Sequence, residues 1–249
     1  MNVVITGAAG QIGRQLIGEL SEAHELRLID RVPVPQRKSV VADLARNHGV
    51  LGRRAWGFRR KPWISSFEGA DVVVHLAADV RNDAPWKCVL RDNIQVTWNV
   101  VQAAVKYRVP RVVFASSNWA VKALERQLAP ACYALDGPKI GSDISPCPLS
   151  PYGLSKASGE LMGRMFVEQQ ELESFIAVRI GSYHSQPPKN KDIRLWVGPR
   201  DLCSLMRRCV EVEAQGFHIV YGVSAQPMAP YDLSYTTRLL SWKPKQTPW

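Results

Sequence analysis

An α/β fold built on a doubly wound parallel sheet is predicted by three features of the chain. Buried-type strands and amphipathic helices alternate through the first three-quarters of the sequence, which is typical of a parallel sheet covered on both faces. A strand at residues 3–6 turns through three glycines into a helix. A second strand ends in an acidic residue, Asp30. Together these features predict a Rossmann-type sheet with a small C-terminal cap over the site.

The individual elements follow from hydrophobic periodicity and its interruptions. Residues 119–150, rich in Pro, Cys and Gly, are expected to form an irregular connection. We expect residues 1–181 to form the nucleotide-binding domain and residues 182–249 a closely packed cap within one globular unit. The remaining strands are expected at 25–29, 40–44, 71–78, 111–117, 175–180 and 217–223, and helices at 11–20, 86–107, 151–170, 199–214 and near the C-terminus.

The composition is that of an ordinary globular protein. Of the 249 residues, 46% are hydrophobic and 22% are charged, which allows a full core. No apolar run approaches the length of a transmembrane helix. Because the chain begins directly on the first strand, we expect no signal peptide and a cytoplasmic location. The five cysteines show neither a CxxC pair nor metal-ligand spacing, so we expect reduced thiols and no metal.

The net charge of +10 is partly concentrated in residues 46–67, where basic and aromatic side chains are interspersed. Such a segment can bind a phosphate, an acidic partner or a nucleic acid. No nucleic-acid-binding motif accompanies it, so a solvated surface insertion is favoured and nucleic acid is not an expected partner. The overall positive charge would attract an anionic substrate.

The glycine-rich turn predicts a dinucleotide site. Its glycines permit a tight turn and let backbone N–H groups approach an anion at the start of the following helix. The same turn without a ligand would be only a tight connection, but a strand before it and a helix after it favour nucleotide binding. The residues of this turn are Gly7, Gly10, Gln11, Ile12 and Gly13.

Asp30, at the end of the second strand, can accept hydrogen bonds from both ribose hydroxyls of an adenosine. Its charge would repel a 2′-phosphate, which favours NAD over NADP. Arg31 follows directly and is a further expected cofactor contact. Its positive charge and those of Arg37 and Lys38 nearby weaken the preference for NAD over NADP.

Tyr152 and Lys156 are candidates for proton transfer. Ser150 can cap a helix that begins at Pro151, so Tyr152 would lie in the first turn with Lys156 on the same face. A nearby ammonium and a helix N-terminus both favour a phenolate, so the tyrosine could act as a base far below its ordinary pKa of about 10. Simple packing can also produce such a pair.

Ser116 and Ser117 end the strand at 111–117, at the edge where open α/β sheets build their sites. A hydroxyl there could hold a substrate alcohol against the tyrosine, or could merely cap the strand.

The chain resembles the extended short-chain dehydrogenase/reductase superfamily, which includes NAD-dependent epimerases and dehydratases. Within it, the chain is most similar to the uronate dehydrogenases, in residues 115–118, 152–156, 178–182 and 241–245. The resemblance spans nearly the whole chain and is poorest at 46–67 and 119–150. The matching pieces are residues 6–13, Asp30, Asp43, Leu44, residues 75–78, Asn93, Ser116, Ser117, Tyr152 and Lys156.

The resemblance implies a catalytic triad of Ser117, Tyr152 and Lys156. Tyr152 would remove the hydroxyl proton, Ser117 would orient that hydroxyl, and Lys156 would lower the tyrosine's pKa and hold the nicotinamide ribose. A homodimer through the helices at 86–107 and 151–170 is also implied. The further cofactor-binding residues implied are Asp43, Leu44, Leu76, Ala77, Ala78, Ile180 and Asn93, with Asn93 on the central helix behind the site. The substrate contacts implied are Asn118, Ser182 and a cation, Lys191 or Arg194.

Three positions depart from the uronate dehydrogenases. Trp119 stands where they have histidine, Val80 where they have serine, and Lys191 where an arginine binds the carboxylate. Lysine is a point charge and cannot form the bidentate fork of an arginine. The cofactor and proton-transfer residues are thus retained, whereas the substrate contacts are altered.

The favoured function is an NAD-dependent dehydrogenase that oxidises a small hydroxylated, anionic sugar. A sugar or cyclitol epimerase or dehydratase would begin with the same hydride transfer. The stretch after Gly181 is short for a lobe that holds a nucleotide-sugar, and the residues beside Ser117 offer no acid–base pair. A non-catalytic nucleotide-binding module is the third hypothesis, but it would not need an ionisable tyrosine.

Overall fold

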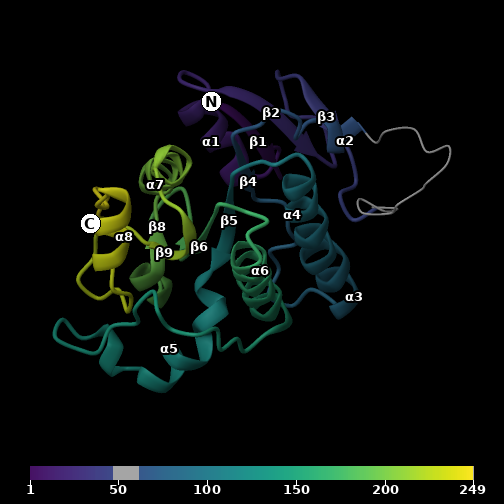
Figure 1. Ribbon diagram of the computed structural model, residues 1–249. Coiled ribbons are helices and arrows are strands. Elements are labelled where there is room, and N and C mark those ends of the chain that lie inside the picture. Colours follow the sequence, from purple (N-terminus) through teal and green to yellow (C-terminus); the bar gives the residue numbers. More distant parts are fainter. Residues whose placement is uncertain (47–61, 249) are drawn as a thin grey trace.

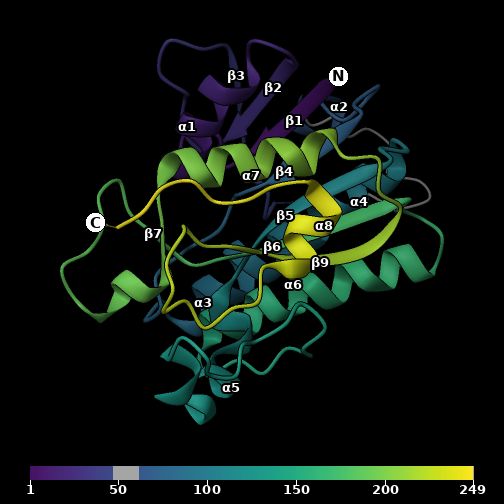
Figure 2. The same cartoon turned by 90° about the vertical axis from the view of Figure 1, so that its left-hand side faces the viewer.

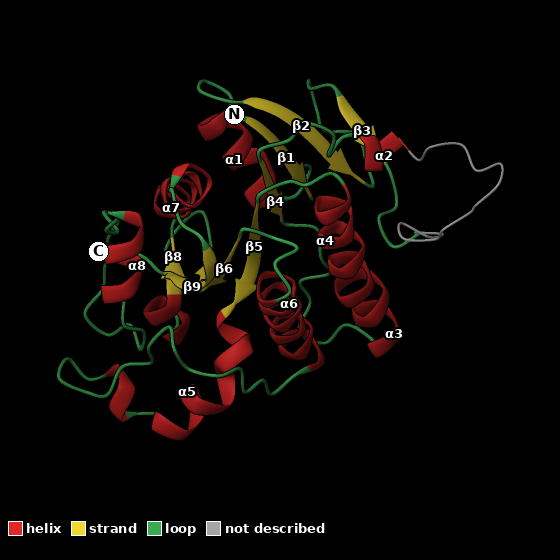
Figure 3. Cartoon of the chain, viewed as in Figure 1, coloured by secondary structure: helices red, strands yellow, loops and turns green. Residues whose placement is uncertain are grey.

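Seven parallel strands form the central sheet, in the order β3-β2-β1-β4-β5-β6-β9 (Figures 1 and 3). The computed structural model describes residues 1–46 and 62–248. All strand pairs are parallel, which confirms the predicted Rossmann-type sheet. The strands are β1 (Asn2–Thr6), β2 (Glu25–Asp30), β3 (Ser39–Val41), β4 (Val72–His75), β5 (Arg111–Ser117), β6 (Ser174–Ile180) and β9 (Gly216–Gly222).

Helices cover both faces of this sheet. One layer holds α1 (Gln11–Leu20), α7 (Pro199–Glu211) and α8 (Ser234–Leu240), with α7 crossing the sheet in Figure 2. The other layer holds α4 (Val96–Lys106) and α6 (Pro151–Glu168), which lie side by side (Figure 1). The shorter helices are α2 (Pro62–Ser65), α3 (Trp86–Val89) and α5 (Lys122–Leu128).

The two layers pack on opposite side chains of the same strands. In β1, Val3 and Ile5 belong to the core under α1 and α7, whereas Val4 belongs to the core under α4 and α6. In β5, Val113 and Phe114 divide in the same way. Successive side chains of a strand point to opposite faces, so a strand covered on both faces must be apolar throughout. This explains the continuous apolar runs in the sequence.

Some elements differ from the sequence prediction. The expected helix at 86–107 consists of α3, a π-helical segment η1 (Leu90–Gln95) and α4. The third strand covers only residues 39–41 instead of 40–44, and the prediction of little regular structure at 119–150 is wrong in part. This connection contains the 3-10 helix η2 (Asn118–Val121), α5 and a second 3-10 helix, η3 (Ala131–Tyr133).

Residues beyond 181 contribute both to the sheet and to the rim of the site. β9 pairs with β6, and α7 packs on α1, while a two-stranded sheet of β7 (Ser182–Tyr183) and β8 (Trp196–Val197) flanks the 3-10 helix η4 (Lys191–Leu195). The division at residue 181 stays a prediction. Most of the basic insertion, residues 47–61, lies outside the described residues. Among the described helices, none is long and apolar enough to cross a membrane.

Candidate active site

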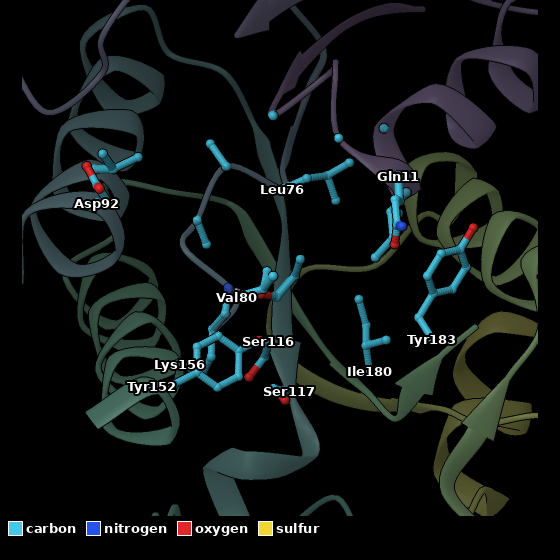
Figure 4. A pocket seen from close by; sticks show the side chains of 18 of the residues that line it. Gln11, Leu76, Val80, Asp92, Ser116, Ser117, Tyr152, Lys156, Ile180 and Tyr183 are labelled. Atoms are coloured by element: carbon cyan, nitrogen blue, oxygen red, sulfur yellow. Dashed lines mark hydrogen bonds between the residues drawn. The ribbon is translucent and has the colours of Figure 1, made fainter. Parts of the chain in front are cut away.

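A cavity of about 860 Å³ opens at the carboxyl ends of the central strands. Its walls come from the β1–α1 turn, from the ends of β2, β4, β5 and β6, and from the first turns of α6 (Figure 4). β1 lies between β2 and β4, so the winding of the chain reverses at this point. Open α/β sheets bind their ligands at such a switch point.

The glycine turn forms one wall and requires glycine for steric reasons. Gly7 has a φ of +73°, and an added Cβ would lie 2.6 Å from the backbone nitrogen of Ala77. A Cβ on Gly13 would lie 2.5 Å from the carbonyl oxygen of Gly7. Gly10 caps α1 without a side-chain hydrogen bond, so the N–H groups of the first turn remain available to an anion. This geometry fits a pyrophosphate.

Asp30 is fixed beside this turn. Its carboxylate accepts hydrogen bonds from the N–H of Ala9 at 2.9 Å and from the N–H of Val32 at 3.3 Å. Arg31 also lines the cavity and is paired with Asp92 at 3.3 Å. An anchored carboxylate next to the glycine turn fits the ribose of a dinucleotide.

Most of the other predicted cofactor contacts also line the cavity, namely Gln11, Ile12, Asp43, Leu44, Leu76, Ala77, Ala78 and Ile180. Asn93 does not. It is buried, accepts the N–H of Asp79 at 2.7 Å, and donates to Asp79 O and to Ser155 Oγ on α6. Asn93 therefore fixes the loop after β4 against α6, behind the cavity wall.

The three predicted catalytic residues come together at the cavity. Ser150 caps α6 by accepting the N–H of Gly153, which places Tyr152 in the first turn as predicted. The hydroxyls of Tyr152 and Ser117 share a hydrogen bond. Lys156 Nζ lies 5.7 Å from the Tyr152 ring centroid and donates to Ala115 O at 2.8 Å. Figure 4 shows these side chains clustered on one side of the cavity, across from Gln11, Ile180 and Tyr183.

Burial governs the charges of this cluster. It lowers the pKa of Lys156 to about 8. The pKa of Tyr152 lies above its ordinary value because burial penalises the phenolate more than the hydrogen bond with Ser117 stabilises it. A tyrosine pKa well below 10, expected from the Tyr–Lys spacing, is therefore not found in this structure. The spacing correctly indicated proximity, but it could not reveal how deeply both groups are buried.

The predicted substrate contacts are only partly assembled. Asn118 and Ser182 line the cavity. Arg194 is not among the described lining residues, and its guanidinium carbon lies 4.6 Å from the centre of the Tyr133 ring. Lys191 begins η4, and its side chain lies outside the described part of the structure.

Sequence reasoning missed a polar cluster next to Asn118. Lys122, at the start of α5, lines the cavity and donates to the buried Glu125 one turn later. Glu125 also accepts the hydroxyls of Tyr133 at 2.8 Å and of Tyr231 at 2.6 Å. The helical spacing of Val121, Leu124 and Leu128 could have indicated α5, but the partner 106 positions away could not be inferred. Asp192 is a further missed lining residue, whereas Trp119, identified in the sequence as an altered substrate position, does line the cavity.

A second buried network lies beneath β5, the strand that ends at Ser117. The Arg179 guanidinium on β6 donates to both carboxylate oxygens of Glu160 on α6, each at 2.9 Å. Ser116 also donates to Glu160, and Arg179 donates to the Tyr221 hydroxyl at 3.0 Å. Both charged side chains are almost fully buried, at 0% and 1% exposure. The network ties β5, β6, β9 and α6 together directly behind Ser117.

Comparisons with known proteins agree with this geometry. The family model described as NAD dependent epimerase/dehydratase family matches residues 3–218. The NAD-dependent glucose-6-phosphate dehydrogenase of Haloferax volcanii is 33% identical over 98% of this chain and 92% of that protein. The uronate dehydrogenase of Agrobacterium fabrum is 31% identical over 98% of this chain and 84% of that protein.

A solved structure shares the fold. The crystal structure of uronate dehydrogenase from Agrobacterium tumefaciens superimposes with a TM-score of 0.80 at 30% identity, covering 99% of this chain and 85% of that chain. The described sheet, the glycine turn and the Ser–Tyr–Lys cluster agree with the match to the family model. The chain therefore belongs to the NAD dependent epimerase/dehydratase family.

Proposed function

We propose that the protein is an NAD-dependent dehydrogenase that oxidises a hydroxyl group of a small sugar or sugar acid. The observation that carries this proposal is the meeting of Ser117, Tyr152 and Lys156 in the cavity that also contains the glycine turn and Asp30. Relatives of similar length are named as dehydrogenases of glucose 6-phosphate and of uronates. An epimerase of the same family would use the same cluster, so the two differ in whether reduced cofactor is released.

In this mechanism, Ser117 orients the substrate hydroxyl and Tyr152 takes its proton at the phenolic oxygen. The carbon–hydrogen electron pair leaves as hydride, so an alcohol becomes a carbonyl and a cyclic aldose becomes a lactone. Lys156 is charged below its pKa of about 8 and stabilises the phenolate through its positive charge. Bound NAD supplies the hydride acceptor and a positive ring that further favours the phenolate.

The preference for NAD over NADP rests on Asp30. A fixed carboxylate can accept two ribose hydroxyls but repels a 2′-phosphate. Arg31, the nearest cation in the sequence, already pairs with Asp92. It therefore offers little compensation for that repulsion.

The test is NADH formation by the purified protein with NAD. The panel contains glucuronate, galacturonate, glucose 6-phosphate, neutral aldoses and cyclitols, and NADP replaces NAD in parallel. We expect NADH to accumulate with at least one sugar or sugar acid. Epimerised sugar without NADH would favour the epimerase, and NAD binding without either product would favour a non-catalytic module.

A homodimer and a cytoplasmic location are parts of the same proposal. The outer side of α6 carries exposed Leu154, Leu161 and Met165, at positions that share one helical face. A second copy of the chain would bury this apolar stripe. Light scattering should give the dimer mass for the unaltered protein and the monomer mass for Leu161→Glu. A monomeric unaltered protein would contradict the proposal.

A further inference from the structure

The substrate side of the cavity contains a cation that neither the glycine turn nor the Ser–Tyr–Lys cluster uses. Three positively charged side chains line the described part of the cavity, namely Arg31, Lys122 and Lys156. Arg31 pairs with Asp92, and Lys156 donates to Ala115 O beside the tyrosine. Lys122 follows closely on Ser117 and Asn118 in the chain. Of these three described cations, it is therefore the one best placed to contact a substrate.

We propose that Lys122 binds an anionic group of the sugar substrate, a carboxylate or a phosphate, and so selects charged over neutral sugars. The inference rests on the proposed function and names a specificity-determining residue for it. It stands beside the expectation that a cation after β6 performs this task, and the side chain of Lys191, one of the two cations expected there, lies outside the described part of the structure. Arg194 there is stacked on Tyr133 instead of lining the described cavity.

The position of Lys122 is fixed by the elements around it. β5 ends at Ser117, the single turn η2 follows, and Lys122 begins α5. η2 packs against α6, the helix that carries Tyr152. The ammonium also lies 5.5 Å from the centre of the Trp119 ring, which lines the same cavity. A substrate held against Ser117 and Tyr152 would therefore have Lys122 on one side.

Glu125 holds the ammonium in place without using up its hydrogen bonds. A lysine ammonium has three N–H donors, and Glu125 accepts one of them. Burial raises the pKa of both Tyr133 and Tyr231, and the hydrogen bond with Glu125 and its charge raise it further, so both hydroxyls remain neutral donors to the carboxylate. Among the described residues, Glu125 is the one hydrogen-bond acceptor of Lys122, so the other two N–H donors of the ammonium are available to an anion.

The cluster also connects Lys122 to a second substrate contact. Tyr231, which donates to Glu125, is hydrogen bonded to the side chain of Asn118. Asn118 directly follows the catalytic Ser117 and lines the cavity. Asp192 lines the cavity as well and would repel an anion placed beside it. An anionic group is therefore favoured at Lys122 and disfavoured beside Asp192.

Equilibrium binding tests this assignment independently of turnover. Glucuronate, glucose 6-phosphate and glucose are titrated calorimetrically into the NAD-saturated Tyr152→Phe protein, with and without Lys122→Met. We expect the substitution to weaken whichever anionic sugar binds by about tenfold to a hundredfold, the range of one charge-assisted hydrogen bond, and glucose by less than about threefold. The two anionic sugars distinguish carboxylate from phosphate.

Two matched variants control for charge and folding. Lys139→Met removes the same charge from a lysine that donates to Cys132 O and Ala134 O and does not line the described cavity, so it should leave all three affinities unchanged. Since Lys122→Met leaves Glu125 buried without its cation, Lys122→Met/Glu125→Gln is measured beside it and should show the same selective loss.

An equal loss of affinity for charged and neutral sugars on Lys122→Met would overturn the assignment. It would also be overturned if glucose bound at least as tightly as both anionic sugars to the Tyr152→Phe protein that retains Lys122. The same holds if neither anionic sugar binds. Turnover separates this inference from the proposed function. NADH formation with no selective effect of Lys122→Met refutes only the inference, whereas a selective binding loss without any NADH formation refutes only the dehydrogenase.

Discussion

Replacing Glu160 by glutamine leaves the buried guanidinium of Arg179 without its counter-charge. The two side chains form a bidentate pair with both hydrogen bonds at 2.9 Å. The exposed fraction is 0% for the Arg179 side chain and 1% for the Glu160 side chain. Among the described residues, Arg179 would keep the Tyr221 hydroxyl and the carbonyl of Ile144 as acceptors, and the new glutamine would offer one amide oxygen in place of two carboxylate oxygens. The substitution therefore leaves the positive charge of Arg179 buried under the sheet without an opposite charge.

Removing one partner of a buried ion pair typically costs about 3–5 kcal/mol of unfolding free energy, because the remaining charge is desolvated without compensation. The double variant Glu160→Leu/Arg179→Met removes both charges and should cost less than the two single changes together. We expect Glu160→Leu and Arg179→Met to show a coupling of about 2 kcal/mol in this comparison. The hydroxyls of Ser116 and Tyr221 would still lose a partner, so the double variant remains less stable than the unaltered protein.

Urea unfolding followed by tryptophan fluorescence measures these differences. Glu168→Gln provides the matched control, since it makes the same change at an exposed position on the same helix and should shift stability by less than about 0.5 kcal/mol. A cost for Glu160→Gln similar to that of Glu168→Gln would refute the reasoning. Strictly additive effects in the double-variant cycle would refute it as well.

Two further predictions concern the cofactor site and the core. Asp30→Ala should weaken NAD binding and narrow its advantage over NADP, because the carboxylate that favours ribose hydroxyls is lost; an unchanged ratio of the two affinities would exclude Asp30 as the ribose ligand. Burial, aided by the charge of Lys156, lowers the pKa of His75 to about 3, so between pH 6.5 and 5 the unfolded chain binds a proton that the folded protein does not. The free energy of unfolding should therefore fall by about 2 kcal/mol over this range through His75 alone. His75→Gln should remove that part of the pH dependence. Identical profiles of unfolding free energy against pH for the two proteins would contradict this.

The main elements of the fold could be predicted because their causes are local. Val3, Val4 and Ile5 are all apolar because both faces of β1 are covered, and Gly7 and Gly13 are required where a Cβ would collide with backbone. The Ser150 cap likewise determined where α6 begins. Such signals are carried by neighbouring residues and can be recognised in the sequence alone.

The rest depends on contacts between distant residues. Nothing in the sequence around Glu125 indicates that the Tyr231 hydroxyl reaches it, or that Arg179 and Glu160 meet inside the protein. The pKa of Tyr152 was predicted in the wrong direction for the same reason, since burial depends on how η2, β5 and α6 pack together. Asn93 illustrates a related limit, because a family motif identified the residue but not its contacts with Asp79 and Ser155.

The central claim is that Tyr152 is the base of an NAD-dependent oxidation. The most direct test compares the unaltered protein with Tyr152→Phe, measuring both NADH formation on the best sugar of the panel and NAD affinity by calorimetry. Tyr107→Phe, at the C-terminal end of α4 and outside the described cavity lining, removes a hydroxyl as a control. We predict that Tyr152→Phe lowers kcat by at least about a hundredfold while NAD affinity changes by less than about threefold, and that Tyr107→Phe changes neither. Undiminished NADH formation by Tyr152→Phe would contradict the account.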